Sequence, residues 1–538
     1  MYTLASFPME NQLATTPHIL VETGCSFMSD VPDSTFSPED FGSDERLMVE
    51  QAEQFSRKEV TPVADRLDAQ EDGLMPSLIR KAGQLGFCGI DSPEQYGGLG
   101  MGKNLAARIL EHLSLNGSFS VTFGVTSGIA QLGLSLFGTD EQKAKYLPQL
   151  SSGEWIGAYC LSEPNSGSDA LSLSTRADEV SGKWILNGTK MWISNAKWAE
   201  FFLVMAKVNG TDVAAFLVER SFPGVSISRE EHKMGLKGSS TARVVLENAE
   251  VPLENLLYIP GKGHHVAFNA LNIGRFKLAA MSLGPARDAI YECSQYAKDR
   301  KQFGRSLSEF GLIRQKLADM ASFYFAAEST LYRTGSNIDA AFDLYGGSID
   351  GNRAAAEEFA VECSASKVLA TEVESRIVDE ALQIYGGYGF TEEFPLARMY
   401  RDARVSRIYE GTNEINRIFL ADRLKRKVDE GKASLTGCGS FVSDLTARAF
   451  KAFEKDQVIV GALSDLVLLT YAEQSARLRA AKVGGIAQSA YERFTNWANC
   501  EAALAYQTVL GESVTVPAPH KGHVDDLADA ILAKRAPL

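Results

Sequence analysis

The sequence predicts an α+β protein of several domains, in which two helical domains flank a smaller β domain and a further helical module ends the chain. Three observations lead to this prediction. Apolar residues recur at helical spacing from about residue 44 to 137 and again from about 266 onward. Between about 155 and 260 the pattern changes to short β-rich runs. At 538 residues, 45% of them apolar, the chain is too long for one core.

The first part of the chain divides into an extension and a helical domain. Residues 1–40 mix Pro, Ser, Thr and acidic residues without a sustained period, and we interpret them as an N-terminal extension. A helical domain is predicted over residues 41–157. The apolar residues of 48–55 and of 104–115 keep helical spacing on either side of a glycine-rich break.

A middle β domain is predicted over residues 158–262. The runs 201–208 and 213–218 are rich in β-forming residues, and Asn187-Gly188 and Asn209-Gly210 are strong hairpin signals. The rest of the chain returns to the helical period.

A C-terminal helical domain is predicted over residues 263–427, and an additional helical module over 435–538 after a stretch rich in glycine, serine and charged residues. Apolar residues in 307–320 and 365–382 repeat at helical spacing in the domain, and those in 458–481 repeat in the same way in the module.

Charge and cysteine usage narrow the function classes. A formal net charge of -14 and a pI of about 5.2 argue against nucleic acid as a partner, because phosphate binding needs concentrated Lys and Arg. The seven cysteines are scattered and never in C-x-x-C spacing, so we expect a reducing compartment and no metal site. The first basic residue is Arg46 and no run approaches about 20 apolar residues. We therefore expect a cytoplasmic protein whose membrane contact, if any, is peripheral, at the inner face.

The stretch from Arg407 to Glu414 is the most informative one for chemistry. It sets the carboxylate of Glu410 between an aromatic ring and a glycine, in an otherwise apolar and basic neighbourhood. A desolvated carboxylate has a raised proton affinity and suits a base that takes a weakly acidic proton. The alternative is half of a surface ion pair.

Four other motifs add context. The turn at 159–169 is dense in hydroxyls and backbone N-H groups and can bind a polar ring or a phosphate, although a plain interdomain loop has the same composition. Trp192 and Ser194 share a face if they lie on a strand, where the indole can stack on a planar cofactor or be buried in a core. Arg300 in the segment 299–304 suits a pyrophosphate or a solvated surface. Glycines in 383–389 permit close backbone approach to a ligand or cap a helix.

Together these motifs resemble the acyl-CoA dehydrogenase family, because they occur in its order and spacing over about residues 40–425. The additional module, with Phe310-Gly311-Leu312-Ile313, is most similar to the very-long-chain subgroup and its complex I assembly-factor relative. The resemblance implies an N-terminal helical domain, a middle β domain and a C-terminal helical bundle, with FAD between the last two and a neighbouring subunit. Ser194 stands where Thr is common, and Phe310-Gly311 replaces a His-Gln pair of medium-chain members.

The resemblance also assigns residues to the cofactor and the substrate. The FAD residues would be Tyr159, Leu161, Ser162, Gly167, Ser168, Trp192, Ile193, Ser194, Arg300, Gln302, Phe303, Gln383, Gly386, Gly387, Thr412 and Glu414. Those near the acyl-CoA would be Ser168, Asn272, Arg275, Tyr409 and Gly411. Gln383, Gly386 and Gly387 are expected to reach across the subunit boundary to the adenosine pyrophosphate that Arg300 and Gln302 hold.

Glu410 matches the family's catalytic base, which removes the α-hydrogen of an acyl thioester as a proton while the β-hydrogen leaves as hydride to flavin N5. In some relatives the base lies instead on the helix that holds the position of Gly274, which has no side chain here. Val121 and Val125 are apolar and Gly124 and Gly128 are small in the segment that matches the bottom of the acyl cavity, so a long acyl chain is expected.

The expected activity is FAD-dependent dehydrogenation of a long-chain acyl-CoA in fatty acid β-oxidation. Electron-transfer flavoprotein is the expected electron acceptor. The module favours a homodimer at a membrane surface, or it is a plain helical cap. The alternatives are an acyl-thioester oxidase, a dehydrogenase of carrier-protein thioesters, and a non-catalytic assembly protein on the same fold.

Overall fold

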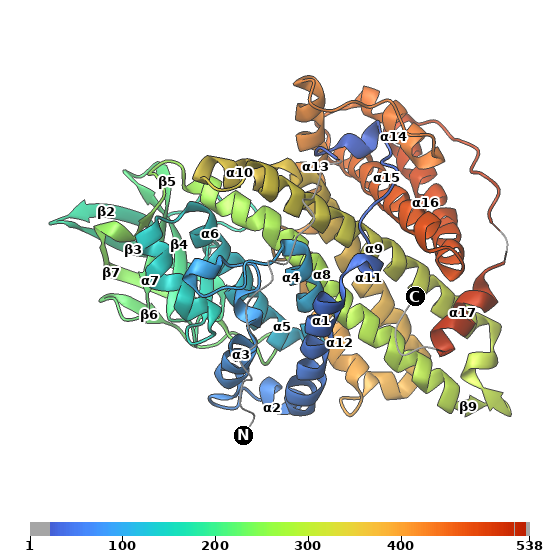
Figure 1. Ribbon diagram of the computed structural model, residues 1–538, viewed down its shortest axis with the longest axis horizontal. Coiled ribbons are helices and arrows are strands. Elements are labelled where there is room, and N and C mark those ends of the chain that lie inside the picture. The colour runs from blue at the N-terminus through green and yellow to red at the C-terminus, as the bar shows by residue number, and fades with distance from the viewer. Residues whose placement is uncertain (1–21, 521, 534–538) are drawn as a thin grey trace.

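The structure, a computed structural model, describes residues 22–520 and 522–533 (Figure 1). Its first helical domain precedes the sheet and packs beside it. The main helices of this domain are α1 (Ser43–Phe55), α3 (Leu74–Gln84), α4 (Lys103–Leu113), α5 (Gly117–Gly124), α6 (Gln131–Phe137) and α7 (Asp140–Ser151). A π-helical turn, Val125–Ala130, joins α5 to α6.

The middle domain is one eight-stranded sheet at one end of the molecule (Figure 1). Its strand order is β6-β7-β3-β2-β4-β5-β8, and β1 pairs with β4 in parallel. The strands are β1 (Gly157–Cys160), β2 (Arg176–Val180), β3 (Lys183–Ser194), β4 (Phe201–Val208), β5 (Asp212–Glu219), β6 (Val225–Ile227), β7 (Thr241–Pro252) and β8 (Leu256–Leu257). The register of β3 against β7 shifts between Lys190 and Ile193, which marks a bulge at the end of β3.

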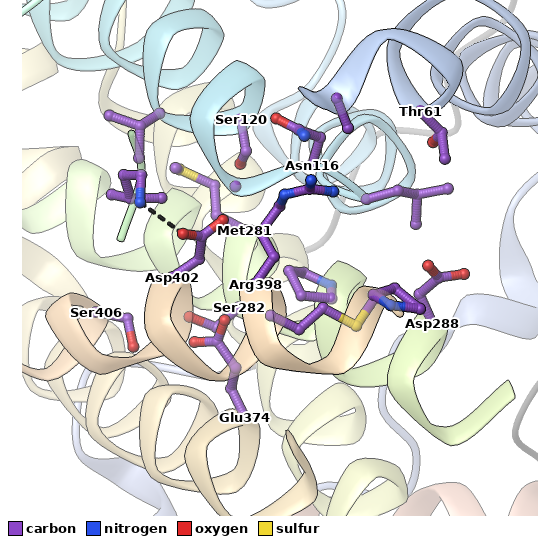
Figure 2. Close-up of a pocket in the computed structure, with 18 of the residues that line it drawn as sticks. Thr61, Asn116, Ser120, Met281, Ser282, Asp288, Glu374, Arg398, Asp402 and Ser406 are labelled. Atoms are coloured by element: carbon purple, nitrogen blue, oxygen red, sulfur yellow. Dashed lines mark hydrogen bonds between the residues drawn. The ribbon is translucent and has the colours of Figure 1, made fainter. Parts of the chain in front are cut away.

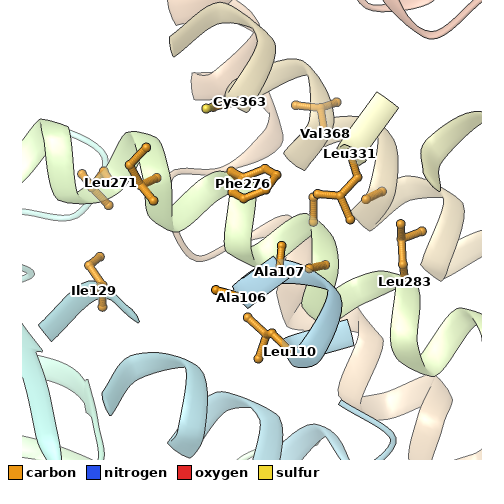
Figure 3. Close-up of a cluster of buried hydrophobic side chains, with 14 of the residues drawn as sticks. Ala106, Ala107, Leu110, Ile129, Leu271, Phe276, Leu283, Leu331, Cys363 and Val368 are labelled. Atoms are coloured by element: carbon orange, nitrogen blue, oxygen red, sulfur yellow. The ribbon is translucent and has the colours of Figure 1, made fainter. Parts of the chain in front are cut away.

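The second helical domain surrounds one long central helix, α8 (Gly263–Asp299). Its other helices are α9 (Gly311–Tyr345), α10 (Ile349–Glu358), α11 (Ala360–Tyr385), α12 (Pro395–Ala403) and α13 (Asn413–Asp429). Figure 3 shows the core where Phe276 of α8 meets Leu331 of α9 and Val368 of α11, with Leu110 of α4 on the other side. The core is thus shared by both helical domains and fixes the site residues of α8.

The expected fold of helical, β and helical domains with an added helical module is confirmed. The module contains α14 (Phe441–Ala449), α15 (Gln457–Val483), α16 (Ile486–Leu510) and α17 (Val524–Ala533), and α15 and α16 pack on α9 (Figure 1). A small β-hairpin, β9 (Lys301–Gln302) and β10 (Arg305–Ser306), follows α8.

The predicted N-terminal extension is built into the core where the structure describes it. Cys25, Phe27 and Met28 are buried, and the Arg333 guanidinium of α9 pairs with the Glu22 carboxylate at 2.5 Å. The amide Nε2 of Gln474 in α15 donates to the Phe27 carbonyl at 3.3 Å. Residues 22–28 therefore join α9 to the C-terminal module, while residues 1–21 of the predicted extension lie outside the described residues.

One helical stretch, Gly117–Phe137, is 21 residues long with a mean hydropathy of 1.3, which by length and composition is enough to cross a membrane. The expectation that no run approaches this apolarity is wrong here, since the stretch carries no charged residue. It is 78% buried inside the protein, as a core helix is.

Candidate active site

A cavity of about 260 Å³ lies between α5, α8, the turns of the β domain and the turn that carries Glu410. Most of the predicted site residues line it. They are Tyr159, Leu161, Ser162, Gly167, Ser168, Trp192, Ile193, Ser194, Arg275, Tyr409, Glu410 and Gly411. Residues more than 250 positions apart in the sequence therefore meet at one site.

The Glu410 carboxylate is desolvated in this cavity. Its oxygen Oε2 is buried and has no hydrogen-bond partner among the residues the structure describes. Burial raises the pKa of Glu410 to about 7, against the opposing positive charges of Arg275 and Lys367. A carboxyl group with this pKa can accept a proton near neutral pH and release it again.

The turn that carries Glu410 is held in a strained backbone conformation. Glu410 has a φ of 58° and Gly411 a φ of 82°, both in the left-handed region. Arg275 Nε donates to the Glu410 carbonyl at 3.2 Å, and Lys367 Nζ donates to the Gly411 carbonyl at 2.9 Å. The amide of Asn416 donates to the same Gly411 carbonyl at 2.8 Å. These bonds fix the turn so that the side chain of Glu410 points into the cavity.

Gly274 on α8 leaves the space that the carboxylate needs. A Cβ atom at Gly274 would lie 3.0 Å from Glu410 Oε2. Gly274, the position considered for an alternative base, thus has no side chain and lies close to the Glu410 carboxylate.

The β-domain side of the cavity differs in detail from the expected strand. Trp192 lies at the bulge of β3 with a φ of 61°, so the simple alternation that puts Trp192 and Ser194 on one face does not apply. Met191, Trp192, Ile193 and Ser194 all line the cavity, and 57% of the Trp192 side chain is exposed. An exposed indole at this edge is available to cover a planar group.

A buried ion pair anchors the hydroxyl-rich turn. Lys190 Nζ lies 2.7 Å from Glu163 Oε1, and the backbone N-H of Ser174 donates to Glu163 Oε2 at 2.6 Å. Although burial opposes ionisation, the Lys190 charge and these donors lower the pKa of Glu163 to about 2. Glu163 is therefore ionised and holds the turn of Ser162 and Ser168 against β3.

A second pocket, of about 430 Å³, is formed by Arg300 and Gln302 just after α8 and by Gly386 and Gly387 just after α11. It shares no lining residue with the cavity of Glu410. Arg300 and these glycines, which were expected on opposite sides of a subunit boundary, line one pocket of the same chain because the ends of α8 and α11 meet. The rings of Tyr296 and Tyr385 stack there with centroids 4.1 Å apart.

Five predicted residues line neither pocket. Asn272 is buried, and its oxygen accepts from Arg275 Nη1 at 3.4 Å, so it positions Arg275. The Thr412 hydroxyl caps α13 by accepting from the Ile415 N-H at 3.2 Å. Gln383 and Glu414 are exposed, and Phe303 is 94% exposed at the tip of the β9–β10 hairpin.

Lys367 and Asn416 hold the catalytic turn, yet neither belongs to a motif that the sequence identified. The signal that could have pointed to Lys367 is a lone cation in the apolar run of α11. In the part of the chain that the structure describes, no three His, Cys, Asp or Glu side chains gather in a way that could hold a metal ion.

Models of three domain families match the chain in order. They are the acyl-CoA dehydrogenase N-terminal domain over residues 42–154, the middle domain over 158–249 and the C-terminal domain over 261–425.

Known proteins resemble the chain beyond these domains. A probable acyl-CoA dehydrogenase of Bacillus subtilis is 41% identical over 495 residues, which cover 84% of this chain and 83% of that protein. The human mitochondrial very long-chain specific acyl-CoA dehydrogenase is 36% identical over 84% of this chain and 68% of its own length. The crystal structure of an acyl-CoA dehydrogenase complexed with FAD from Bacillus anthracis superposes with a TM-score of 0.92 at 36% identity, covering 96% of this chain and all of that one.

Proposed function

Because the chain belongs to the acyl-CoA dehydrogenase family, we propose that it is an FAD enzyme that converts a long-chain acyl-CoA to the trans-2-enoyl-CoA in fatty acid β-oxidation. The observation that carries the proposal is the Glu410 carboxylate, which is unpartnered at its buried Oε2 and lines the cavity between the β domain and α8. A base of raised pKa in a water-poor site is what abstraction of an α-proton next to a thioester requires.

The cavity has the chemistry to hold a flavin. The exposed indole of Trp192 can cover the ring, and the hydroxyls of Ser162 and Ser194 line the same cavity. At the second pocket, Gly386 and Gly387 have no atom within 4 Å of where a Cβ would stand, so a ligand can approach the backbone there. When bound, FAD supplies an acceptor for the substrate's β-hydride.

The chain's own residues carry the proton chemistry. Glu410 Oε2 takes the α-proton, and its pKa of about 7 lets the carboxylate be present at neutral pH without being too weak a base. The backbone N-H of Glu410 donates to no carbonyl or side chain among the described residues, so it is free to bind the thioester oxygen as negative charge develops there. Arg275 and Lys367 keep the turn in place.

The apolar lining of the cavity supports a long acyl substrate. Val121, Gly124, Val125 and Gly128 are apolar or small, and all four line the cavity. Spectral titration of the holoenzyme with C8-, C12- and C16-CoA tests this: we expect flavin bleaching to be fastest with C16. A clear optimum at C8 would contradict the long-chain assignment.

The same titration with Glu410→Gln tests the base. Gln has nearly the same shape but accepts no proton at neutral pH, so the variant should bind FAD and acyl-CoA and fail to reduce the flavin. Substantial bleaching would place the base elsewhere. Fast reoxidation of the reduced wild type in air would favour an oxidase, and a preparation without flavin absorbance would favour a non-catalytic role.

The two pockets support a homodimer as part of this proposal. Arg275 of α8 and Arg300, the first residue after α8, are 25 residues apart, which at 1.5 Å per residue is roughly 37 Å along the helix axis. That separation exceeds the length of one dinucleotide, so one FAD cannot use both pockets of the same chain. A second copy that brings its Arg300 pocket to this chain's Trp192 cavity would complete the site.

The proposal also includes the electron acceptor and the location. Electron-transfer flavoprotein is the proposed acceptor, in a cytoplasmic enzyme that touches the inner face of the membrane through its C-terminal module. Val458 and Leu504 are exposed apolar residues of that module and support this contact. Co-sedimentation with liposomes should fall in the Val458→Asp, Leu504→Asp double variant; equal binding would remove the membrane role.

A further inference from the structure

A third, smaller cavity, whose lining Figure 2 shows, shares part of its wall with the proposed acyl cavity. Its volume is about 90 Å³, and Val121, Leu278, Met281 and Tyr409 line both cavities. Met281 is part of the wall between them. Its sulfur would lie 2.8 Å from a Cβ at Gly124, so the glycine makes room for this side chain. Methionine has an unbranched, flexible side chain and can move aside for a ligand.

One side of this small cavity is polar. Figure 2 shows Ser282, Glu374 and Asp402 around it, from α8, α11 and α12. Glu374 Oε2 and Ser282 Oγ are buried, and neither meets the geometry of a hydrogen bond with a described residue, although the hydroxyls of Ser282 and Ser406 lie near enough to the Glu374 carboxyl group to act on its pKa. Their residues are 5% and 2% exposed. Each unsatisfied buried polar atom destabilises the fold unless a ligand or a water molecule pairs with it.

We propose that this cavity binds the terminal hydroxyl of an ω-hydroxyacyl chain, whose thioester end lies at Glu410 and whose apolar middle passes between Val121, Leu278 and Met281. The inference rests on the proposed function and adds a substrate class to it. A hydroxyl both donates and accepts, so it can pair with Glu374 Oε2 and Ser282 Oγ at once. A methyl end would leave both atoms unpaired.

The charges around the cavity argue for a neutral end group. Asp288, Glu374 and Asp402 line it together with one cation, Arg398. Arg398 is already paired with Asp68 at 2.9 Å and with Asp65, so it is not free to bind a carboxylate. Asp402 accepts from the Leu236 N-H at 2.5 Å. An ω-carboxylate would find no free cation to balance its charge and should be rejected, and an ammonium end would have to be desolvated among Val121, Leu278 and Met281.

Three matched series of acyl-CoA substrates test the inference: plain, ω-hydroxy and ω-carboxy chains of equal length from C10 to C18. The measurement is kcat/KM for flavin reduction by the holoenzyme. At the length that reaches the small cavity, we expect the ω-hydroxy chain to exceed the plain chain by about fivefold, as one additional net hydrogen bond implies. The ω-carboxy chain should be the poorest of the three.

Variants distinguish an effect of the polar side chains in the small cavity from a general loss of activity. Glu374→Leu should bring the ratio of ω-hydroxy to plain chain below one and leave turnover of plain chains measurable, and the milder Ser282→Ala should lower the ratio. Glu362→Leu is the matched control, because Glu362 is another buried α11 carboxylate with an unpartnered Oε2 that lines neither cavity. It should leave the ratio unchanged.

Three results would overturn the inference that the small cavity binds an ω-hydroxyl group. Preference for the plain chain at every length in the wild type overturns the inference, since water would then satisfy Glu374 and Ser282. A ratio that Glu374→Leu and Ser282→Ala leave unchanged overturns it as well. If no plain chain reduces the flavin, the proposed function itself fails, and the inference fails with it.

Discussion

Two buried cations act on Glu410 from outside its own motif. Lys367 Nζ and Arg275 Nε hold the carbonyls of Gly411 and Glu410, and both positive charges hold down the pKa of Glu410. Burial in turn lowers the pKa of Lys367 to about 7, against the attraction of the Glu410 carboxylate. The strength of the base is thus set by a balance between desolvation and two nearby positive charges, of which that of Lys367 itself titrates near pH 7.

Replacing Lys367 with Met should move the pH profile of catalysis upward. Glu410 acts as base only when ionised, so kcat/KM in the wild type should rise with pH through about 7. Without the Lys367 charge the pKa of Glu410 increases, and the rise should occur at higher pH. Stopped-flow flavin reduction across pH 5.5–9 measures the shift. Lys367→Arg retains the charge and should restore most of the wild-type profile; an identical profile in Lys367→Met would show that Lys367 is structural only.

Gly274→Ala should impair the chemical step specifically. The new Cβ would stand 3.0 Å from Glu410 Oε2, which forces the carboxylate to move by a few tenths of an ångström. Misplacement of a catalytic group costs up to about 100-fold in rate, so we expect flavin reduction to slow by about 10- to 100-fold. Flavin content and substrate binding should be unchanged, and a normal reduction rate would show that the carboxylate has room to adjust.

The residues that the structure brings together could be predicted where a motif is local, but not where the fold brings distant parts of the chain together. Glu410, Tyr159 and Trp192 stand in short motifs and line one cavity. Lys367 stands in no motif and is 43 residues from Glu410, so only packing of α11 against the turn makes it a partner. Asn272 is in the right helix but faces Arg275, because the period of α8 turns it away from the cavity.

At the scale of elements, the β9–β10 hairpin is the most exposed part of the predicted cofactor machinery. Phe303 at its tip has a φ of 54° and Gly304 a φ of 78°, as a tight two-residue hairpin turn requires. With 94% of Phe303 exposed, the hairpin presents an aromatic ring to solvent in the single chain. Such a residue is costly to expose unless a second copy covers it.

Phe303→Asp should therefore weaken the proposed dimer and reduce retained FAD. A charge cannot be buried in an apolar contact without a partner, so assembly should lose affinity. Analytical ultracentrifugation and the flavin-to-protein absorbance ratio measure the two effects. Leu47→Asp, at a 61% exposed apolar position of α1, is the control and should change neither. Retention of both dimer and flavin in Phe303→Asp would remove the hairpin from the interface.

The periodicity of the sequence predicted the type and order of the helices and strands. It did not predict where these elements are irregular. The helical repeats and Asn-Gly turns predicted two helical domains and a sheet, which the structure contains. The bulge at Trp192 and the π-helical turn at Val125–Ala130 were not predicted, since neither has a distinct composition. Both irregular points line the acyl cavity.

Across the whole molecule, several buried carboxyl groups have pKa values above their usual range. Burial raises the pKa of Glu410 and Glu362 to about 7, of Glu374 to about 8 and of Asp402 to about 6. A carboxyl whose pKa is raised by folding stabilises the fold while protonated, and this contribution is lost as pH rises through the folded-state pKa. His112 acts in the opposite sense, because burial lowers its pKa to about 3.

The free energy of unfolding should consequently fall as pH rises from about 5 to 8. Each such carboxyl contributes a slope of at most about 1.4 kcal/mol per pH unit between its unfolded and folded pKa values. Glu374→Leu should make the free energy of unfolding fall less steeply between pH 5 and 8. Urea unfolding at fixed pH values measures the slope. A decline of equal steepness in Glu374→Leu would mean that Glu374 is not the source.

The joining of residues 22–28 to α15 has a consequence for the order of biosynthesis. Gln474 and Phe27, which are bonded to each other, are 447 residues apart, and Arg333 finds its partners in Glu22 and Gln474. Residues 22–28, the earliest described segment to leave the ribosome, therefore cannot complete their contacts until α15 has been translated. Until then Arg333 lacks its contact with Gln474, and the packing of the second helical domain around Arg333 is incomplete. The docking of residues 22–28 therefore comes late in synthesis, and chaperones that bind exposed apolar segments would have nearly the whole translation time to act on this segment.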